Sequence, residues 1–152
     1  MKQILPFLIL IAVLFSACKK EKKQAQDLCA APTINYNNCI TDSNQVKTQI
    51  IGRWDWTRSI SAWVPVETTP CTDSVYRSYD FMSNGTIQYF ENGNYVSAGT
   101  YTISQSWGLI LNAQDTASTF WLNGVVNICD GYLIVDNQPV DGPKVILARP
   151  GE

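Results

Sequence analysis

Short runs of strand-forming residues, separated by turn signals, fill the sequence from Ile50 onward. The runs are rich in Val, Ile, Thr, Tyr and Trp, and a turn signal follows about every 8 to 12 residues. Asn-Gly and Asp-Gly pairs, which supply the positive φ angles of tight hairpins, stand at 84–85, 92–93 and 130–131. The pattern is typical of an all-β sandwich or barrel. Eight strands are predicted, at 50–60, 75–82, 85–91, 94–103, 107–112, 117–128, 131–136 and 143–149.

The order of Cys71, Trp107 and Cys129 bears on the choice between a sandwich and a barrel. An immunoglobulin-like sandwich also has a Cys, Trp, Cys order, but its Trp lies on the strand that directly follows the first Cys. Here 36 positions and several predicted strands separate Cys71 from Trp107. We therefore predict a closed, eight-stranded antiparallel up-and-down β-barrel over residues 50–149, a fold that leaves no sheet edge exposed.

The N-terminus has the pattern of an export signal. Lys2 precedes an apolar run from Ile4 to Phe15, which is shorter than the roughly 20 residues of a membrane-spanning helix. Small residues and then Cys18 follow, and this resembles the lipobox of bacterial lipoproteins, although Phe15 stands where Leu is usual. The resemblance implies a signal peptide over 1–17 and a Cys18 that carries diacylglycerol and fatty acyl chains such as palmitate. A plain secretory signal followed by a coincidental cysteine is the alternative.

Residues 18–49 are predicted to form the acylated Cys18, a basic tether and an irregular N-terminal segment. The tether holds four Lys and two acidic residues over 19–27, and basic residues near anionic headgroups add about 1 kcal/mol each to acyl anchoring. From Leu28 on, the chain has 6 basic and 11 acidic residues, a net charge of −5, which argues against a nucleic-acid partner. The expected partner is a membrane. The expected location is the cell envelope, most simply the outer membrane, on its periplasmic face or at the cell surface.

Four cysteines remain after Cys18, and an even number in an exported domain predicts two disulfides. Cys29 and Cys39 flank a short polar loop and can pair locally, which leaves Cys71 to pair with Cys129. The barrel, however, places Cys71 at one rim and Cys129 at the other, and Cα atoms more than about 7 Å apart cannot be bridged. Either the 61–74 loop folds down the barrel wall and brings Cys71 to Cys129, or Cys129 pairs with Cys29 or Cys39, and both options stay open.

The stretch "GRWDWTR" opens the barrel. Because side chains alternate along a strand, Gly52, Trp54, Trp56 and Arg58 share one face, and the tryptophans place that face inward. The first and last strands of an up-and-down barrel are neighbours, so Arg149 at the end of "KVILAR" points inward at the rim where Trp54 lies. We predict a barrel floor of Gly52, Trp54 and Arg149, with a cation–π contact of about 0.5–2 kcal/mol.

The segments "GRWDW", "FMSNGT" and "YFENGNYVSAGTYTI" follow one another in that order. They resemble the lipocalin superfamily, and more closely the lipocalin-like lipoproteins of some Gram-negative bacteria. The resemblance covers residues 50–149 and implies a barrel that is closed at the Trp54 and Arg149 end and open at the other. Cys71 and Cys129 lie outside the family pattern.

Catalysis has little support in the sequence. It contains no histidine, which excludes His-based triads and His-ligated metal sites. Paired cysteines leave no thiolate nucleophile, and no motif places two carboxylates together. We predict no enzyme activity, no metal site and no cofactor, and we make no prediction of oligomeric state.

A ligand cavity is the sharper hypothesis, because eight strands enclose room for side chains or for one small ligand. Two arginines are predicted to point inward near the open rim, above an aromatic interior, where they could hold the carboxylate of a lipid-like molecule. In the alternative, both arginines are solvated or pair with Glu67 or Asp73, and the aromatic residues are core. The predicted ligand-binding residues are Arg58, Arg77, Trp56, Tyr79 and Tyr101.

A second function class is an envelope module with a filled barrel that binds a protein or a glycan. The loop at 61–74 places Trp63 and Val64 beside prolines at the predicted surface. An exposed aromatic side chain there suits a partner contact, and its alternative is a Trp63 that packs back on the barrel.

Overall fold

The computed structural model describes residues 32–64, 66–115, 117 and 120–151. The predicted signal peptide, Cys18, the tether and Cys29 lie outside the described residues. Among the residues that are described, none of the helices has the length and hydrophobicity of a membrane-spanning segment.

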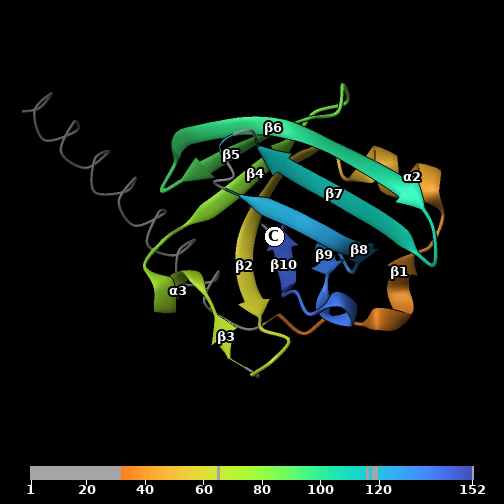
Figure 1. Cartoon of the computed structure of the whole chain (residues 1–152), viewed down its shortest axis with the longest axis horizontal. Coiled ribbons are helices and arrows are strands. Elements are labelled where there is room, and N and C mark those ends of the chain that lie inside the picture. The colour runs from red at the N-terminus through yellow and green to blue at the C-terminus, as the bar shows by residue number, and fades with distance from the viewer. Residues whose placement is uncertain (1–31, 65, 116, 118–119, 152) are drawn as a thin grey trace, which may run out of the picture.

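Eight antiparallel strands form a closed barrel (Figure 1). Each strand pairs with its neighbour in the chain, with the minor strand β3 set aside, and the first and last strands of the barrel pair with each other. The predicted all-β, up-and-down barrel is therefore confirmed, and each predicted strand has its counterpart. The barrel strands are β2 (Gly52–Ile60), β4 (Arg77–Phe81), β5 (Thr86–Glu91), β6 (Asn94–Gln105), β7 (Leu109–Asp115), β8 (Trp121–Cys129), β9 (Tyr132–Asp136) and β10 (Lys144–Ala148).

The predicted turn dipeptides form the hairpins. Asn92 and Gly93 have φ angles of 50° and 78°, and Asp130 and Gly131 have 50° and 81°. Positive φ at both central residues matches the right-handed twist of the flanking strands, which is why these two pairs connect β5 to β6 and β8 to β9 directly.

Short elements outside the barrel wall complete the fold. One of them, the helix α2, starts at the cap residue Asp42, whose carboxylate accepts from the backbone N–H groups of Asn44 and Gln45 at 3.0 and 2.8 Å. Val46 of this helix and Ile50 after it are fully buried in the barrel interior. The packed unit thus begins upstream of Ile50. The short elements are η1 (Tyr36–Asn38), β1 (Cys39–Ile40), α2 (Ser43–Gln49), β3 (Glu67–Thr68), α3 (Pro70–Asp73) and η2 (Gln138–Val140).

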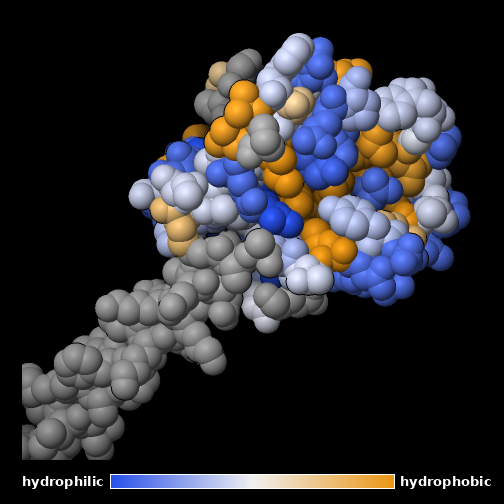
Figure 2. Space-filling view, turned by 90° about the horizontal axis from the view of Figure 1, so that it is seen from below, coloured by the Kyte–Doolittle hydropathy of each residue, from blue (hydrophilic) through white to orange (hydrophobic). Residues whose placement is uncertain are grey.

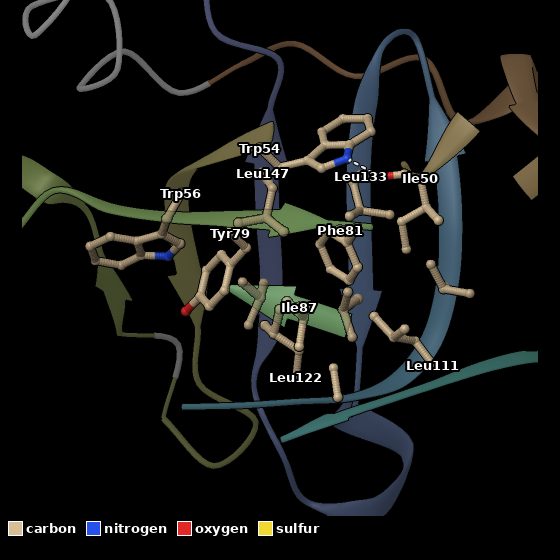
Figure 3. Close-up of a cluster of buried hydrophobic side chains, with 14 of the residues drawn as sticks. Ile50, Trp54, Trp56, Tyr79, Phe81, Ile87, Leu111, Leu122, Leu133 and Leu147 are labelled. Carbon is tan, nitrogen blue, oxygen red and sulfur yellow. Dashed lines mark hydrogen bonds between the residues drawn. The ribbon is translucent and has the colours of Figure 1, made fainter. Parts of the chain in front are cut away.

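The barrel interior holds one cluster of buried side chains to which seven of the eight barrel strands contribute, and the partly buried Tyr101 and Ile103 of β6 pack against it (Figure 3). Burial of this apolar surface is the main stabilising contribution to such a fold. Aliphatic side chains and Trp54 surround one end of the cluster, and Trp56 and Tyr79 lie toward the other. Its fully buried members include Trp54, Phe81, Ile87, Leu111, Leu133 and Leu147.

A disulfide joins Cys39 to Cys129, with an S–S distance of 1.99 Å and a Cα–Cα distance of 4.0 Å. The connectivity with a Cys71–Cys129 bond is therefore wrong, and the alternative in which Cys129 pairs with Cys39 is confirmed. The reason is that β1 pairs with the end of β8 and places the two cysteines opposite each other. Cys71 is disulfide-bonded as well, and since Cys39 and Cys129 bond each other, neither is its partner.

Candidate functional site

The structure brings Gly52, Trp54 and Arg149 together at one end of the barrel, the floor. The Cζ atom of Arg149 lies 3.9 Å from the centroid of the Trp54 ring. Its guanidinium donates to the carbonyl oxygens of Ile51 at 3.0 Å and of Arg53 at 3.4 Å, and also to that of Gln49. The last contact places a cation at the C-terminus of α2, where the helix dipole and unpaired carbonyls favour it.

The backbone conformation at position 52 favours glycine. Gly52 has a φ of +106°, a conformation that L side chains rarely adopt, and a Cβ atom there would lie 2.8 Å from Nη1 of Arg149. The Trp54 indole donates to the carbonyl of Ile50 at 2.7 Å. The floor is therefore closed by side chains that are bonded to main-chain carbonyls.

Arg58 does not lie on the face that strand alternation predicts. In the pairing of β2 with β10, Ile146 lies opposite Arg58 and Leu147 lies opposite Trp56, so Thr57 is one extra residue, a β-bulge. The Thr57 hydroxyl donates to the carbonyl of Ile146 at 2.9 Å. The bulge reverses the alternation, so Arg58 shares the outer face with Ile146. The prediction of an inward Arg58 is wrong for this reason.

Arg58 instead holds two chain segments on the outer wall. Its guanidinium lies 2.9 Å from a carboxylate oxygen of Glu67 on β3 and donates to the carbonyl of Pro32 at 3.4 Å. Its Nε is buried and makes no hydrogen bond among the described residues. This arginine fastens β3 and the start of the described chain to the barrel, away from the interior.

Arg77 does point inward, at the end of the barrel opposite the floor, which we call the mouth. Its Cζ lies 4.5 Å from the centroid of the Trp56 ring. The guanidinium is bonded to the carboxylate of Asp73, and its Nε lies 4.0 Å from a carboxylate oxygen of Glu91, which faces Arg77 across β4 and β5. Each of the two predicted arginines is thus paired with an acidic residue.

Three aromatic rings lie beneath Arg77. Tyr79 and Tyr89 stack with centroids 5.2 Å apart, and Phe120 lies 5.7 Å from Tyr79 and 5.5 Å from Tyr89. The Tyr89 hydroxyl donates to the carboxylate of Glu91. Burial raises the pKa of both tyrosines, and the hydrogen bond to Glu91 adds to the effect on Tyr89. The phenols are therefore neutral over the physiological pH range.

Sequence reasoning missed Tyr89, Glu91 and Phe120 as residues of the mouth. The cross-strand pairing of Arg77 with Glu91 and of Tyr79 with Tyr89 places two of them there. The Ser-Asn-Gly turn at 83–85 determines this pairing. The register of the hairpin could therefore have been used to predict that Tyr89 and Glu91 lie at the mouth.

Tyr101 lies away from the mouth. Its hydroxyl donates to the carbonyl of Met82 at 2.8 Å, and its ring meets the edge of Phe81 at 5.1 Å, both beside the turn at the floor end. A hollow of about 190 Å³ adjoins it on the barrel wall. The lining of this hollow is uncharged and consists of Thr100, Tyr101, Thr102, Asn112, Ala113 and Gln114.

Metal-binding chemistry is not assembled in the part of the chain that the structure describes, because no group of three or more Cys, Asp or Glu side chains is placed to hold an ion. Comparisons with protein-family models, curated proteins and solved structures found no match. The closed eight-stranded barrel is compatible with the lipocalin-like fold that the sequence motifs imply.

Proposed function

We propose that this protein is an exported lipoprotein, acylated at Cys18 and held at the outer membrane, whose barrel binds a small apolar or amphipathic molecule without catalysing a reaction. The export signal, the cysteine that follows it and the basic tether support the membrane anchor. The observation that carries the binding role is the asymmetry of the barrel. At one end Arg149 is bonded to main-chain carbonyls, and at the other Trp56 and the stacked tyrosines lie buried beneath Arg77 and its acidic partners.

The ligand is expected at the mouth rather than deep in the barrel, because a cluster of buried side chains occupies the interior. Above the aromatic rings of the mouth, Arg77 lies between the carboxylates of Asp73 and Glu91. A fatty-acid carboxylate must compete with these two carboxylates for a single guanidinium. The mouth therefore suits a neutral or cationic headgroup better than the carboxylate that two inward arginines would have held.

The test is native mass spectrometry of the protein extracted from its own membrane. A stoichiometric small molecule, together with the mass of an acylated N-terminal cysteine, is the expected result. Titration with a monoacylglycerol, an alkyltrimethylammonium and a fatty acid of equal chain length then ranks the headgroups, with the fatty acid weakest. Asp73→Asn combined with Glu91→Gln should improve fatty-acid binding, whereas Asn112→Ala on the outer wall is the control. An empty protein that binds none of the three amphiphiles contradicts the proposal.

An interaction module with a filled barrel is the second candidate. It is favoured by the exposure of Trp63, whose side chain is 75% exposed, and of Val64 beside it. Trp63→Ser should then abolish retention of an envelope partner while leaving amphiphile binding at the mouth unchanged.

A further inference from the structure

Exposed apolar side chains gather on two loops at the mouth. The tip of the hairpin between β2 and β3 presents Trp63, Val64 and Val66, which are 75%, 58% and 55% exposed. The loop between β9 and β10 presents Val140, which is 61% exposed. Because Lys144 pairs with Ile60, the two loops leave the barrel side by side. Figure 2 views the molecule from the side of this hairpin and shows hydrophobic surface between polar areas.

Exposed apolar residues continue around the mouth from β2 to its neighbour β4 and on to β6. Tyr95 is 58% exposed at the start of β6, and Tyr76 is 38% exposed just before β4. Tyr76 is held against the turn between β5 and β6 by two hydrogen bonds with Asn92, of 2.7 and 3.0 Å. Apolar side chains that gather in this way on a folded protein mark an interaction surface.

The chain enters the described structure next to the same hairpin. The carbonyl of Pro32 accepts from Arg58, which precedes the Ser59–Thr68 pair at the base of the hairpin. Only residues 19–31 separate Pro32 from Cys18. Thirteen residues span at most about 45 Å when fully extended, so an acyl anchor on Cys18 keeps the mouth within that distance of the bilayer.

We infer that the rim formed by Trp63, Val64, Val66 and Val140 docks on the bilayer surface, so that the mouth faces the membrane. The inference rests on the acyl anchor of the proposed function. A short tether gives the rim a high effective concentration at the membrane, so a weak contact is enough to orient the barrel. Trp suits this position, because its apolar ring and polar N–H favour the membrane–water interface.

The apolar rim of Trp63, Val64, Val66 and Val140 has acidic rather than basic neighbours, and this determines which lipids it can contact. Glu67 lies beside the hairpin tip, and Asp141 follows Val140. Docking is therefore driven by apolar contact, and zwitterionic lipid suffices for it, whereas the lysines of the tether supply any preference for anionic lipid. A mouth that faces the membrane receives a membrane-derived amphiphile without passage of its acyl chain through water.

The first experiment uses the acylated mature protein in phosphatidylcholine vesicles whose acyl chains carry bromine, which quenches the fluorescence of an indole that reaches them. The wild type should be quenched, and Trp63→Ser should lower the quenching at least twofold. Trp107→Ser is the matched control, because Trp107 is 66% exposed but lies in the turn after β6, at the floor end. Equal quenching in wild type and Trp63→Ser, or a loss in Trp107→Ser, overturns the inference.

The second experiment is independent of acylation. The Cys18→Ser protein should bind the same vesicles weakly, and Trp63→Ser in that background should lower the partition coefficient about tenfold, with Trp107→Ser unchanged. No vesicle binding by the Cys18→Ser protein overturns the inference. So does a stoichiometric envelope protein that Trp63→Ser releases while vesicle binding is unaffected. A missing acyl mass or an empty mouth in native mass spectrometry instead contradicts the proposed function, so the two failures are distinguishable.

Discussion

The two ends of the barrel hold the same contact, an arginine over a tryptophan, in different surroundings. Trp54 and Trp56 are two positions apart on β2, and the guanidinium carbons lie 3.9 and 4.5 Å from their ring centroids. Arg149 at the floor donates to main-chain carbonyls, which are fixed by the fold. Arg77 at the mouth is paired with carboxylates on side chains that are 35% and 42% exposed.

Because of this difference, we expect the contact at the floor to stabilise the fold and the contact at the mouth to rearrange easily. At the floor, moving Arg149 removes a cation–π contact together with its hydrogen bonds to carbonyls of Gln49, Ile51 and Arg53, whose positions the fold fixes. At the mouth, Arg77 and its acidic partners can exchange each other for water at small cost. The floor is expected to govern stability, and the mouth to tolerate change.

The largest expected effect is at the floor end, where the Cys39–Cys129 bond fastens β1 just ahead of α2. The bond closes a loop of 90 residues, and in the chain-entropy account such a loop contributes about 4.6 kcal/mol. Replacing both cysteines with alanine should lower the free energy of unfolding by about this amount, measured by urea denaturation. A loss below about 1 kcal/mol would contradict the view that the N-terminal segment is part of the floor.

The second expectation concerns Gly52. Gly52→Ala should cost about 3 kcal/mol, because an L residue is strained at this φ and the new methyl group displaces Arg149. Gly93→Ala is the matched control, since Gly93 also has a positive φ, +78°, but an added Cβ meets nothing within 4 Å. It should cost about 1 kcal/mol. Equal losses in the two variants would show that the contact with Arg149 adds nothing to the backbone effect.

The third expectation compares the two arginines directly. Arg149→Met should lower the free energy of unfolding by about 2 kcal/mol, because it removes a cation–π contact and the hydrogen bonds of a charged donor to three main-chain carbonyls. Arg77→Met should cost less than about 1 kcal/mol, since its ion pairs are partly solvated. Both variants keep an unbranched side chain over the indole, so packing changes are matched. If Arg77→Met lowers the free energy of unfolding more than Arg149→Met does, the view that the floor governs stability is wrong.

The sequence was enough to predict the barrel and its floor. Strand alternation and Asn-Gly or Asp-Gly turns are local signals, and an up-and-down barrel makes the first and last strands neighbours. From this alone, Trp54 on the first strand and Arg149 after the last meet at one rim. The contact between Trp54 and Arg149 could be predicted because barrel closure is the one contact between residues far apart in the sequence that it requires.

The two wrong predictions, an inward Arg58 and a Cys71–Cys129 bond, have a different origin. Both depend on how strands pair, which the alternation of side chains along one strand does not determine. The bulge at Thr57 is one residue long and exists because β10 bonds to β2 with a shifted register, yet it moves Arg58 to the other face. The Cys39–Cys129 bond depends on β1, a strand of two residues that pairs across 90 positions of sequence. Loop closure favours a bond between neighbouring cysteines, and tertiary pairing overrides that preference.

The smallest expected effect tests whether the mouth excludes water around its tyrosines. Burial raises the pKa of Tyr79 above the usual value near 10. The stability that this tyrosine contributes is therefore fully present below about pH 10 and is lost as the pH rises toward the folded-state pKa, because the unfolded chain ionises first. Near pH 11 the loss amounts to about 1 kcal/mol.

Tyr79→Phe removes this ionisation, so the decrease in unfolding free energy between pH 9 and pH 11 should be smaller than in the wild type by about 1 kcal/mol. Urea denaturation at the two pH values measures it. Tyr36→Phe is the control, since Tyr36 is 57% exposed on η1, and it should leave the decrease unchanged. If Tyr79→Phe also leaves the decrease in unfolding free energy between pH 9 and pH 11 unchanged, water reaches the stacked tyrosines. The mouth is then an open, hydrated entrance down to Tyr79, and an amphiphile would bind by displacing that water rather than by exchanging with Arg77.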